Sequence, residues 1–439
     1  MHALFEHLTF FVGRAIDILW NMSPEQFLLV FWPLLLLSVP RFLLSEIFIL
    51  IRSYLVRTPS AKTHFVASLQ SEQPQVSILL PSYNEADTLE GTVQALREQT
   101  YPNLEIIVVS GGSDDGMDQV GRRLARRGWI RYFENARRGG KSSAANMAFK
   151  ASRGKYIVYC DADSTFDRDA LWHLLAEFYR PDVAAVSGNV RVRNATTNLL
   201  TRCQALQYIM GIGVGRRVTD WLSILFIISG VFGAVRRSTL ESIGAWQPGP
   251  GEDADLTLKL RVSGSQIAFA PNAICMTDAP DRWFAYYRQQ IRWNRSVVRF
   301  RLRVYRWLLY PRRPFTWANL IGTLDLVVFQ VTFACIFPFY LIWLYTTYYN
   351  VFWYLLFSVT LIYVLINYMH YGIALALSER RTMDSRLFPY VPLYGLFIGW
   401  WLRIVRLVAY ADEWLLKSSY RSPYVPGNVQ RQMRQKHPW

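Results

Sequence analysis

The segment Val76-Ser77-Ile78-Leu79-Leu80 is an apolar run of strand length that ends in the turn Pro81-Ser82. Similar runs follow at residues 104–109, 156–160 and 183–187, and helical periodicity appears between them, first over Thr88–Gln99. Short apolar strands separated by helical stretches predict a parallel, doubly wound α/β sheet over residues 75 to about 280. Because ligands bind such sheets beyond the carboxyl ends of the strands, the polar residues that directly follow the strands are the candidate site.

The composition of the chain is typical of a membrane protein. It has 439 residues, of which 52% are hydrophobic and 15% aromatic, and a formal net charge of +16. Lys and Arg cluster beside apolar segments, which fits cytoplasmic loops and anionic lipid head groups and argues against nucleic acid as a partner. The 4 cysteines lie far apart without CxxC spacing, so neither a zinc site nor a disulfide framework is expected. Glu6, Arg14 and Asp17 in the first segment argue against a cleavable signal peptide.

Apolar stretches flank the predicted sheet on both sides. Residues 3–20 either lie in the membrane interface as an amphipathic helix or span the membrane, and residues 27–51 are long enough to cross a ~30 Å hydrocarbon core. Two strong spans are predicted at 320–345 and 351–377, and a further stretch at 387–410 is broken by prolines and an arginine. If all three cross, the basic tail lies outside, against the positive-inside rule. Either the last stretch re-enters or the rule fails here.

These features divide the chain into five parts. They are an N-terminal membrane region (1–57), a cytoplasmic α/β domain (58–299), an amphipathic interface helix (300–316), C-terminal transmembrane helices (317–411) and a basic tail (412–439). Arg52 and Arg57 follow the first span, so the α/β domain is expected on the cytoplasmic side of the inner (plasma) membrane. The basic segments at 299–313 and 421–436 either contact lipid or receive a small regulatory or export subunit.

The residues after the first strand, Tyr83-Asn84-Glu85, suit either a nucleotide site or a helix cap. In a nucleotide site, Tyr83 would stack on a nucleobase, and nearby polar groups such as Glu85 would face the ribose. In the alternative, Asn84 and Glu85 cap the helix that follows.

A glycine-rich turn, Gly139-Gly140, precedes Lys141 at the predicted start of a helix. Free backbone amides, a helix N-terminus and a lysine together form an anion site. The GxxxxGK[ST] spacing of a Walker loop is absent. A solvated lysine is the alternative interpretation.

The third strand ends in Asp161-Ala162-Asp163. Two carboxylates one residue apart at the end of a buried strand are costly unless a cation lies between them. Oxygen ligands suit Mg²⁺ or Mn²⁺, which would bridge the carboxylates to a diphosphate. A loop cap is the alternative.

The stretch from Gly251 to Trp293 contains the groups that a sugar transfer needs. Asp253, which follows a Gly-Pro-Gly turn, can take a proton from an attacking hydroxyl. Arg292 can hold a leaving diphosphate, and Trp293 offers a flat surface to a sugar ring. An acidic helix start and a membrane-surface Arg-Trp pair are the alternative explanations.

The order of these motifs resembles that of the family 2 glycosyltransferases, and among them the membrane-embedded polysaccharide synthases. The matching run is PSYNE, a Gly-Ser-Asp turn, GGKS, DAD, SG at Ser229-Gly230, GEDADLT and QQIRW, over roughly residues 75–300. The family includes synthases of cellulose, chitin, hyaluronan and poly-N-acetylglucosamine. The short chain and the placement of its spans are most similar to the poly-N-acetylglucosamine synthases, whereas QQIRW followed by Ser296 is closer to hyaluronan and chitooligosaccharide synthases.

The resemblance implies a GT-A fold and assigns roles by position. Asp161 and Asp163 would bind the diphosphate and its Mg²⁺ or Mn²⁺, with Asp163 the direct ligand, and Asp253 would be the general base. The expected substrate-binding residues are Tyr83, Glu85, Lys141, Asp161, Glu252, Gln289, Arg292 and Trp293.

One departure from the family pattern concerns the nucleotide. The family usually has an Asp in the turn after the second strand, where it commonly contacts uracil, and this chain reads Ser110-Gly111-Gly112. Asp114, Asp115 or backbone groups would have to take over that contact.

The activity implied by the resemblance is inverting, processive transfer from a UDP-sugar onto a growing β-linked polysaccharide, of poly-N-acetylglucosamine type, with export through the bilayer. One alternative is a glycolipid synthase that adds a single sugar to a membrane lipid. Another is a non-enzymatic transport or scaffold subunit with a degenerate transferase domain. Polyprenyl-phosphate sugar transferases share the early motifs but generally lack QxxRW.

Overall fold

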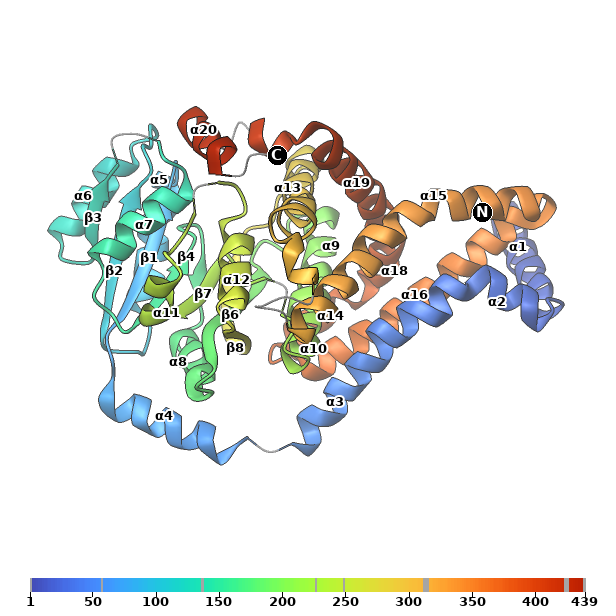
Figure 1. Cartoon of the computed structure of the whole chain (residues 1–439). Helices are drawn as coiled ribbons and strands as arrows, with labels where there is room; N and C mark the ends of the chain where they lie inside the picture. Colours follow the sequence, from blue (N-terminus) through green and yellow to red (C-terminus); the bar gives the residue numbers. More distant parts are fainter. Residues whose placement is uncertain are drawn as a thin grey trace.

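The computed structural model describes residues 2–56, 58–135, 138–225, 227–247, 249–310, 316–421 and 426–436. It shows an α/β domain built around one sheet, beside a group of long helices that extends away from it (Figure 1). Parts of the expected interface helix (311–315) and basic tail (422–425 and 437–439), and the expected topology signal Arg57, lie outside the described residues.

The described residues form one sheet of 8 strands in the order β3-β2-β1-β4-β7-β6-β8-β5. The strands are β1 (Val76–Ser82), β2 (Leu104–Ser110), β3 (Arg131–Glu134), β4 (Tyr156–Cys160), β5 (Thr165–Phe166), β6 (Val183–Val192), β7 (Phe232–Arg236) and β8 (Gln266–Thr277). β1 pairs in parallel with β2 and β4, so that Val76 lies opposite both Leu104 and Tyr156. β7 is antiparallel to β4 and β6, and β5 is antiparallel to β8. The sheet is therefore mixed.

The four strands predicted from the sequence are parallel to one another, which confirms the α/β fold class. β6 runs in the direction of β4 because β7 is antiparallel to both. The expectation of a wholly parallel sheet is wrong at β7 and β5. Gly230 and Gly233 interrupt the apolar pattern around β7 and hide this strand in the sequence. Its antiparallel course places Phe232 opposite Cys160, at the carboxyl end of β4.

Helices cover both faces of the sheet (Figure 1). Those of the α/β domain are α4 (Ser60–Glu72), α5 (Ala86–Arg97), α6 (Met117–Arg126), α7 (Lys141–Ala151), α8 (Ala170–Ala176), α9 (Leu199–Tyr208), α10 (Gly215–Trp221), α11 (Arg237–Ser242), α12 (Glu252–Val262) and α13 (Trp283–Ser296). Strand side chains alternate between two apolar layers, as the period of two requires. Ile78 and Leu80 of β1 pack with α5, α6 and α8, whereas Leu79 packs with α7 and α12. This packing fixes the positions of the strand ends.

The helical part matches the predicted spans. Two helices of the described chain, Trp317–Thr347 and Tyr349–Leu377, are long and apolar enough to cross a membrane. Two bent pairs also qualify: Pro24–Leu35 with Val39–Leu55 at 45°, and Arg381–Leu396 with Trp400–Leu416 at 52°. The described residues therefore contain two candidate spans, or up to four if each bent pair is one broken span and not a re-entrant loop.

Helix α1 (His2–Trp20) packs against α16 (Phe352–Leu377). The ring of Phe11 lies 4.5 Å from that of Tyr354 and 5.4 Å from that of Phe357. Figure 1 places α1 at the end of the helical part that is farther from the sheet. Whether α1 spans the membrane or lies in its interface stays a prediction.

The QQIRW helix α13 continues directly into η4 (Val297–Val304), which is followed by η5 (Arg306–Leu309). The side chains of Arg299 and Arg301 are buried, and Arg299 donates to the carbonyl oxygen of Pro250 at 3.1 Å. This segment therefore contacts the turn before α12 in the α/β domain, and residues 299 and 300 lie inside a continuous helical stretch.

Candidate active site

A cavity of about 1040 Å³ opens at the carboxyl ends of β1, β4 and β6. All ten residues predicted for the site line it: Tyr83, Glu85, Lys141, Asp161, Asp163, Glu252, Asp253, Gln289, Arg292 and Trp293. The parallel strands explain why Tyr83, Glu85, Asp161 and Asp163 converge, because these residues follow β1 and β4, whose carboxyl ends meet at one edge of the sheet. The cavity has the size of a ligand site.

The turn after β1 is hydrogen-bonded to the turn after β2. Asn84 has a left-handed φ of 56°, and its amide group exchanges two hydrogen bonds with Asp114: Nδ2 donates to Oδ1 at 2.7 Å, and Oδ1 accepts from the Asp114 N–H at 3.1 Å. The N–H of Asn84 donates to Ser113 Oγ at 3.1 Å. Tyr83 is 37% exposed at the cavity wall. The turn therefore presents the Tyr83 ring while Asn84 holds it in place.

Lys141 connects the two acidic motifs of the site. It is the first residue of α7, and its Nζ lies 2.5 Å from Asp161 Oδ1 and 3.4 Å from Glu252 Oε1. Nζ also donates to the carbonyl oxygen of Gly230 at 3.3 Å. Burial lowers the pKa of Lys141, but the charges of Asp161 and Glu252 outweigh burial and raise the pKa above its usual range. Lys141 is therefore a permanent cation on the cavity wall.

Three carboxyl groups, those of Glu85, Asp161 and Asp163, interact electrostatically with one another and with Lys141. Burial, followed by the charges of Asp161 and Asp163, raises the pKa of Glu85 to about 8. Burial and Asp161 also raise the pKa of Asp163. One oxygen of Glu85, Oε2, is buried without a hydrogen-bond partner among the described residues. Such mutual repulsion is what a bound divalent cation offsets.

These carboxylates fit Mg²⁺ or Mn²⁺, because both metals take oxygen ligands. Within the described ranges, no group of three or more His, Cys, Asp or Glu residues forms a complete metal site. Mg²⁺ is commonly held by one or two carboxylates together with substrate phosphates. Asp161 and Asp163 would be the protein ligands of that arrangement.

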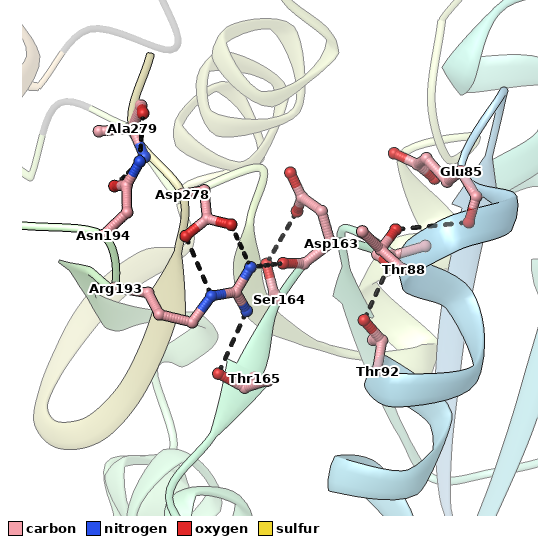
Figure 2. A network of polar contacts seen from close by, with 11 residues as sticks. Glu85, Thr88, Thr92, Asp163, Ser164, Thr165, Arg193, Asn194, Asp278 and Ala279 are labelled. Carbon is pink, nitrogen blue, oxygen red and sulfur yellow. Dashed lines mark hydrogen bonds and ion pairs between the residues drawn. The ribbon is translucent and has the colours of Figure 1, made fainter. Parts of the chain in front are cut away.

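Arg193 holds the loop of Asp163 and was missed in the sequence. Its guanidinium pairs with both carboxylate oxygens of Asp278, with Nη2 2.6 Å from Oδ2 and Nε 3.0 Å from Oδ1 (Figure 2). Nη2 also donates to the carbonyl oxygen of Asp163 at 3.1 Å. Arg193 directly follows β6. Extension of the predicted strand 183–187 to Val192 would have placed this arginine at a strand end.

Asp253 lies in the first turn of α12, with one carboxylate oxygen free of the helix. Its Oδ1 accepts from the N–H of Ala254 at 2.8 Å, and a Cβ added at Gly230 would lie 3.3 Å from Oδ2. Burial raises the pKa of Asp253 to about 6; the charge of Glu252 adds to this effect and Lys141 opposes it. A carboxylate with a pKa near neutrality suits general-base chemistry.

Gly251 allows α12 to begin close to η4. It has a φ of 79°, which favours glycine, and a Cβ there would lie 2.9 Å from Cε2 of Phe300. The turn before Asp253 is therefore fixed by both conformation and packing.

Gln289, Arg292 and Trp293 lie on one face of α13, because residues three and four apart share a helix face. This face lines the cavity, and Trp293 is 41% exposed. Oε1 of Gln289 is buried without a hydrogen-bond partner among the described residues and can accept from a substrate hydroxyl. One turn before Gln289 on α13, Tyr286 stacks on Trp401 of α19 (Gly399–Ala411), with ring centroids 5.0 Å apart.

Arg216 of α10 lines the cavity and, like Arg193, was not predicted from the sequence. Its Nη1 donates to Ser187 Oγ at 2.7 Å, and this hydroxyl also accepts from the N–H of Ser229 at 3.0 Å. Ser229 precedes Gly230, which lies against Asp253. In the sequence Arg216 is only one of two adjacent arginines, and no motif marks it.

The sequence of this chain is similar to those of known glycosyltransferases. Residues 77–244 match the model of the family "Glycosyl transferase family 2". The chain is 28% identical over 242 residues to a poly-beta-1,6-N-acetyl-D-glucosamine synthase of Staphylococcus epidermidis, covering 55% of this chain and 58% of that protein. It is 29% identical over 220 residues to the synthase of the same name from Staphylococcus aureus, covering 50% and 53%. The chain thus spans less than two thirds of the length of these curated relatives.

A solved structure shares the fold. It is the mannosyltransferase PcManGT from Pyrobaculum calidifontis in complex with GDP-Man and Mn²⁺, with a TM-score of 0.53 and 21% sequence identity. The similarity covers 81% of this chain and 99% of that structure. The match extends beyond the residues of the family model, and it supports the mixed α/β architecture. Together, the fold, the order of motifs and the family match show that this chain carries a family 2 glycosyltransferase domain.

Proposed function

We propose that the protein is an inverting, processive hexosyltransferase that polymerises a sugar from a UDP-sugar into a β-linked polysaccharide, of the poly-N-acetylglucosamine type, and passes the polymer across the membrane. The observation that carries the proposal is a single cavity that contains Lys141, Asp161 and Asp253 and extends to the membrane helices. The names of the staphylococcal relatives support the sugar class.

The donor would bind at the carboxyl ends of β1 and β4. Tyr83 would stack on the base, and Lys141 and Arg292 would hold the diphosphate. A Mg²⁺ or Mn²⁺ ion held by Asp161 and Asp163 would act as a Lewis acid on the diphosphate oxygens. Electrostatic stabilisation of a leaving group of this kind is commonly the largest single contribution to catalysis.

Asp253 would take the proton of the acceptor hydroxyl. The hydroxyl oxygen then forms a bond to the anomeric carbon while the bond between that carbon and the phosphate oxygen breaks, and the diphosphate leaves with the electron pair. One in-line displacement of this kind inverts an α-linked donor to a β-glycoside. Trp293 and Gln289 would hold the acceptor sugar beside Asp253.

The helical end of the cavity supports polymer synthesis. Leu326 and Gln330, of the candidate span Trp317–Thr347, and Val408 of α19 line the same cavity as Asp253. A polymer end leaving the base would therefore enter the helical part directly. Arg52, directly after the first predicted span, supports the placement of the α/β domain at a cytoplasmic membrane face.

A glycolipid synthase is the second candidate, and the same feature favours it. A cavity that reaches candidate membrane spans can also admit a lipid acceptor from the bilayer. The two functions differ in product: a long chain or ladder for the polymerase, and a single lipid-soluble addition for the glycolipid synthase.

The test is an assay of the detergent-purified protein with Mg²⁺ and radiolabelled UDP-N-acetylglucosamine, UDP-glucose and UDP-glucuronate, separately and in pairs. Products are sized on a gel and digested with linkage-specific hydrolases. We expect long chains from UDP-N-acetylglucosamine alone. Long chains only with a pair of donors would assign a different polymer, and a single lipid-soluble product would replace the proposal with the glycolipid alternative.

A further inference from the structure

Asp114 and Asp115, the two aspartates that could replace the missing carboxylate after β2, are both hydrogen-bonded to neighbouring parts of the protein. Asp115 caps two helices: its Oδ2 accepts from the N–H of Ala86 at 2.8 Å, and its Oδ1 accepts from the N–H of Met117 at 3.1 Å. Asp114 is bound by Asn84, as described above. Neither aspartate lines the cavity. The structure therefore does not support the expectation that Asp114 or Asp115 takes over the contact with uracil.

Ser110 does not replace the carboxylate either. It is 1% exposed, and its Oγ lies 3.2 Å from Ser113 Oγ. Gly111 does line the cavity, but its N–H donates to the carbonyl oxygen of Ser82 at 2.8 Å. Among the described residues, this wall of the cavity is lined by backbone, the ring of Tyr83, the carboxyl group of Glu85 and the guanidinium of Arg138.

Arg138 lies over one face of the Tyr83 ring. Its guanidinium carbon lies 4.2 Å from the centroid of the Tyr83 ring, a cation–π distance. The backbone of Arg138 is held against the turn after β2, because a Cβ added at Gly112 would lie 3.2 Å from the Arg138 nitrogen. Within the described ranges no carboxylate pairs with Arg138, so its donors can reach a ligand.

We propose that Arg138 determines base recognition in the donor site. The nucleobase of the donor would lie beside Tyr83 and Arg138. The guanidinium of Arg138 would donate a hydrogen bond to a carbonyl oxygen on the edge of the nucleobase. This inference rests on the proposed function, which supplies UDP as the nucleotide. Arginine suits the role because its planar, permanently charged fork both stacks and donates.

If Arg138 recognises uracil, the N3–H of the ring makes no hydrogen bond to the protein. A carboxylate accepts from the ring N3–H, whereas a guanidinium can only donate, and it donates to the carbonyl oxygens beside N3. Methylation of N3 removes the hydrogen and keeps both carbonyl groups. This protein should therefore bind N3-methyl-UDP nearly as well as UDP, and CDP, whose carbonyl at position 4 is an amino group, more weakly.

The test is calorimetric titration of UDP, N3-methyl-UDP and CDP into the full-length, detergent-purified protein with Mg²⁺. We expect UDP and N3-methyl-UDP to bind within about threefold of each other, and Arg138→Ala to weaken both roughly tenfold, as is typical of one lost specific base contact. Arg97→Ala is the matched control, because Arg97 lies over Trp129 at the same 4.2 Å but outside the cavity. It should bind UDP like the unchanged protein.

A second variant restores the carboxylate. Gly111 has no positive φ, but an added Cβ would lie 3.3 Å from the carbonyl oxygen of Ser82, so a side chain there requires the backbone to shift by a few tenths of an ångström. Gly111→Asp should make the site reject N3-methyl-UDP roughly tenfold relative to UDP, with the Tm measured to verify folding.

Rejection of N3-methyl-UDP by the unchanged protein, or unchanged UDP binding in Arg138→Ala, would overturn the role of Arg138 and leave the proposed function standing. If the unchanged protein binds no UDP at all, the proposed donor itself is wrong, and the inference falls with it.

Discussion

Nζ of Lys141 lies 2.5 Å from Oδ1 of Asp161 and so joins the start of α7 to the end of β4. The same ammonium is 3.4 Å from Oε1 of Glu252, next to the proposed base Asp253. One cation therefore connects the acidic motif at the proposed metal site with the acidic motif at the acceptor.

Replacement of this cation should weaken donor binding. We expect Lys141→Met to raise the Kd for UDP by roughly 10- to 100-fold, because a lost charge-assisted contact is worth about 1.5–3 kcal/mol. Asp161 and Glu252 would also lose the charge between them. The measurement is calorimetric titration with UDP and Mg²⁺. Lys150→Met, an exposed change on the same helix, is the control, and equal UDP affinity in the two variants would remove Lys141 from the donor site.

The pKa of Asp253 predicts the acid limb of activity. A base with a pKa of about 6 is ionised above that pH and protonated below it, so kcat/KM should fall about tenfold per pH unit below about 6. Glu252→Gln removes a negative charge that raises this pKa, and should move the limb to lower pH. The pH profiles of the two proteins measure this shift. A limb that stays in place or moves up would contradict the assignment of the titration to Asp253.

Gly230 sets the position of the Asp253 carboxylate. Because a Cβ there would lie 3.3 Å from Oδ2, Gly230→Ala should displace the base by a few tenths of an ångström and lower kcat roughly tenfold, with little change in UDP affinity. Gly91→Ala is the control, since its Cβ would meet nothing within 4 Å. Full activity of Gly230→Ala would show that the base tolerates the contact.

Arg193 should influence the metal through the loop of Asp163. Arg193→Gln removes the pairing with Asp278 and the contact to the Asp163 carbonyl oxygen. Supporting residues of this kind commonly alter metal affinity by tenfold or more, so the Mg²⁺ concentration for half-maximal activity should rise roughly tenfold while kcat at saturating Mg²⁺ recovers. Arg122→Gln breaks a comparable two-contact pair with Glu134 that lies outside the cavity, and should change neither value. A kcat loss that Mg²⁺ does not rescue would indicate a general structural effect.

The sequence predicted the strand ends well because local patterns determine them. The apolar runs of β1, β2, β4 and β6 have strand length, and parallel strands bring the residues after them to one edge. Asp161 and Tyr83 could therefore be assigned to one site before any coordinates. Gln289, Arg292 and Trp293 followed from helical spacing, because residues three and four apart share a face.

What the sequence did not predict depends on contacts between distant segments. β7 is hidden because Gly230 and Gly233 interrupt its pattern, although its antiparallel course brings Gly230 to Asp253. Arg193 and Arg138 carry no motif, and their positions depend on Asp278 and Tyr83, 85 and 55 residues away in the chain. The hydrogen bonds between Asp114 and Asn84, and the helix caps made by Asp115, likewise form only when the two turns are brought together.

The most direct test of the central claim compares the products of the unchanged protein and Asp253→Asn. Both detergent-purified proteins are incubated with Mg²⁺ and radiolabelled UDP-N-acetylglucosamine, products are sized on a gel, and UDP binding is measured in parallel. We predict long chains from the unchanged protein and a loss of transfer of at least roughly 100-fold in Asp253→Asn, with UDP binding retained, because the variant lacks only the proton acceptor. Undiminished chain synthesis by Asp253→Asn, or a single-sugar lipid product from the unchanged protein, would contradict the account.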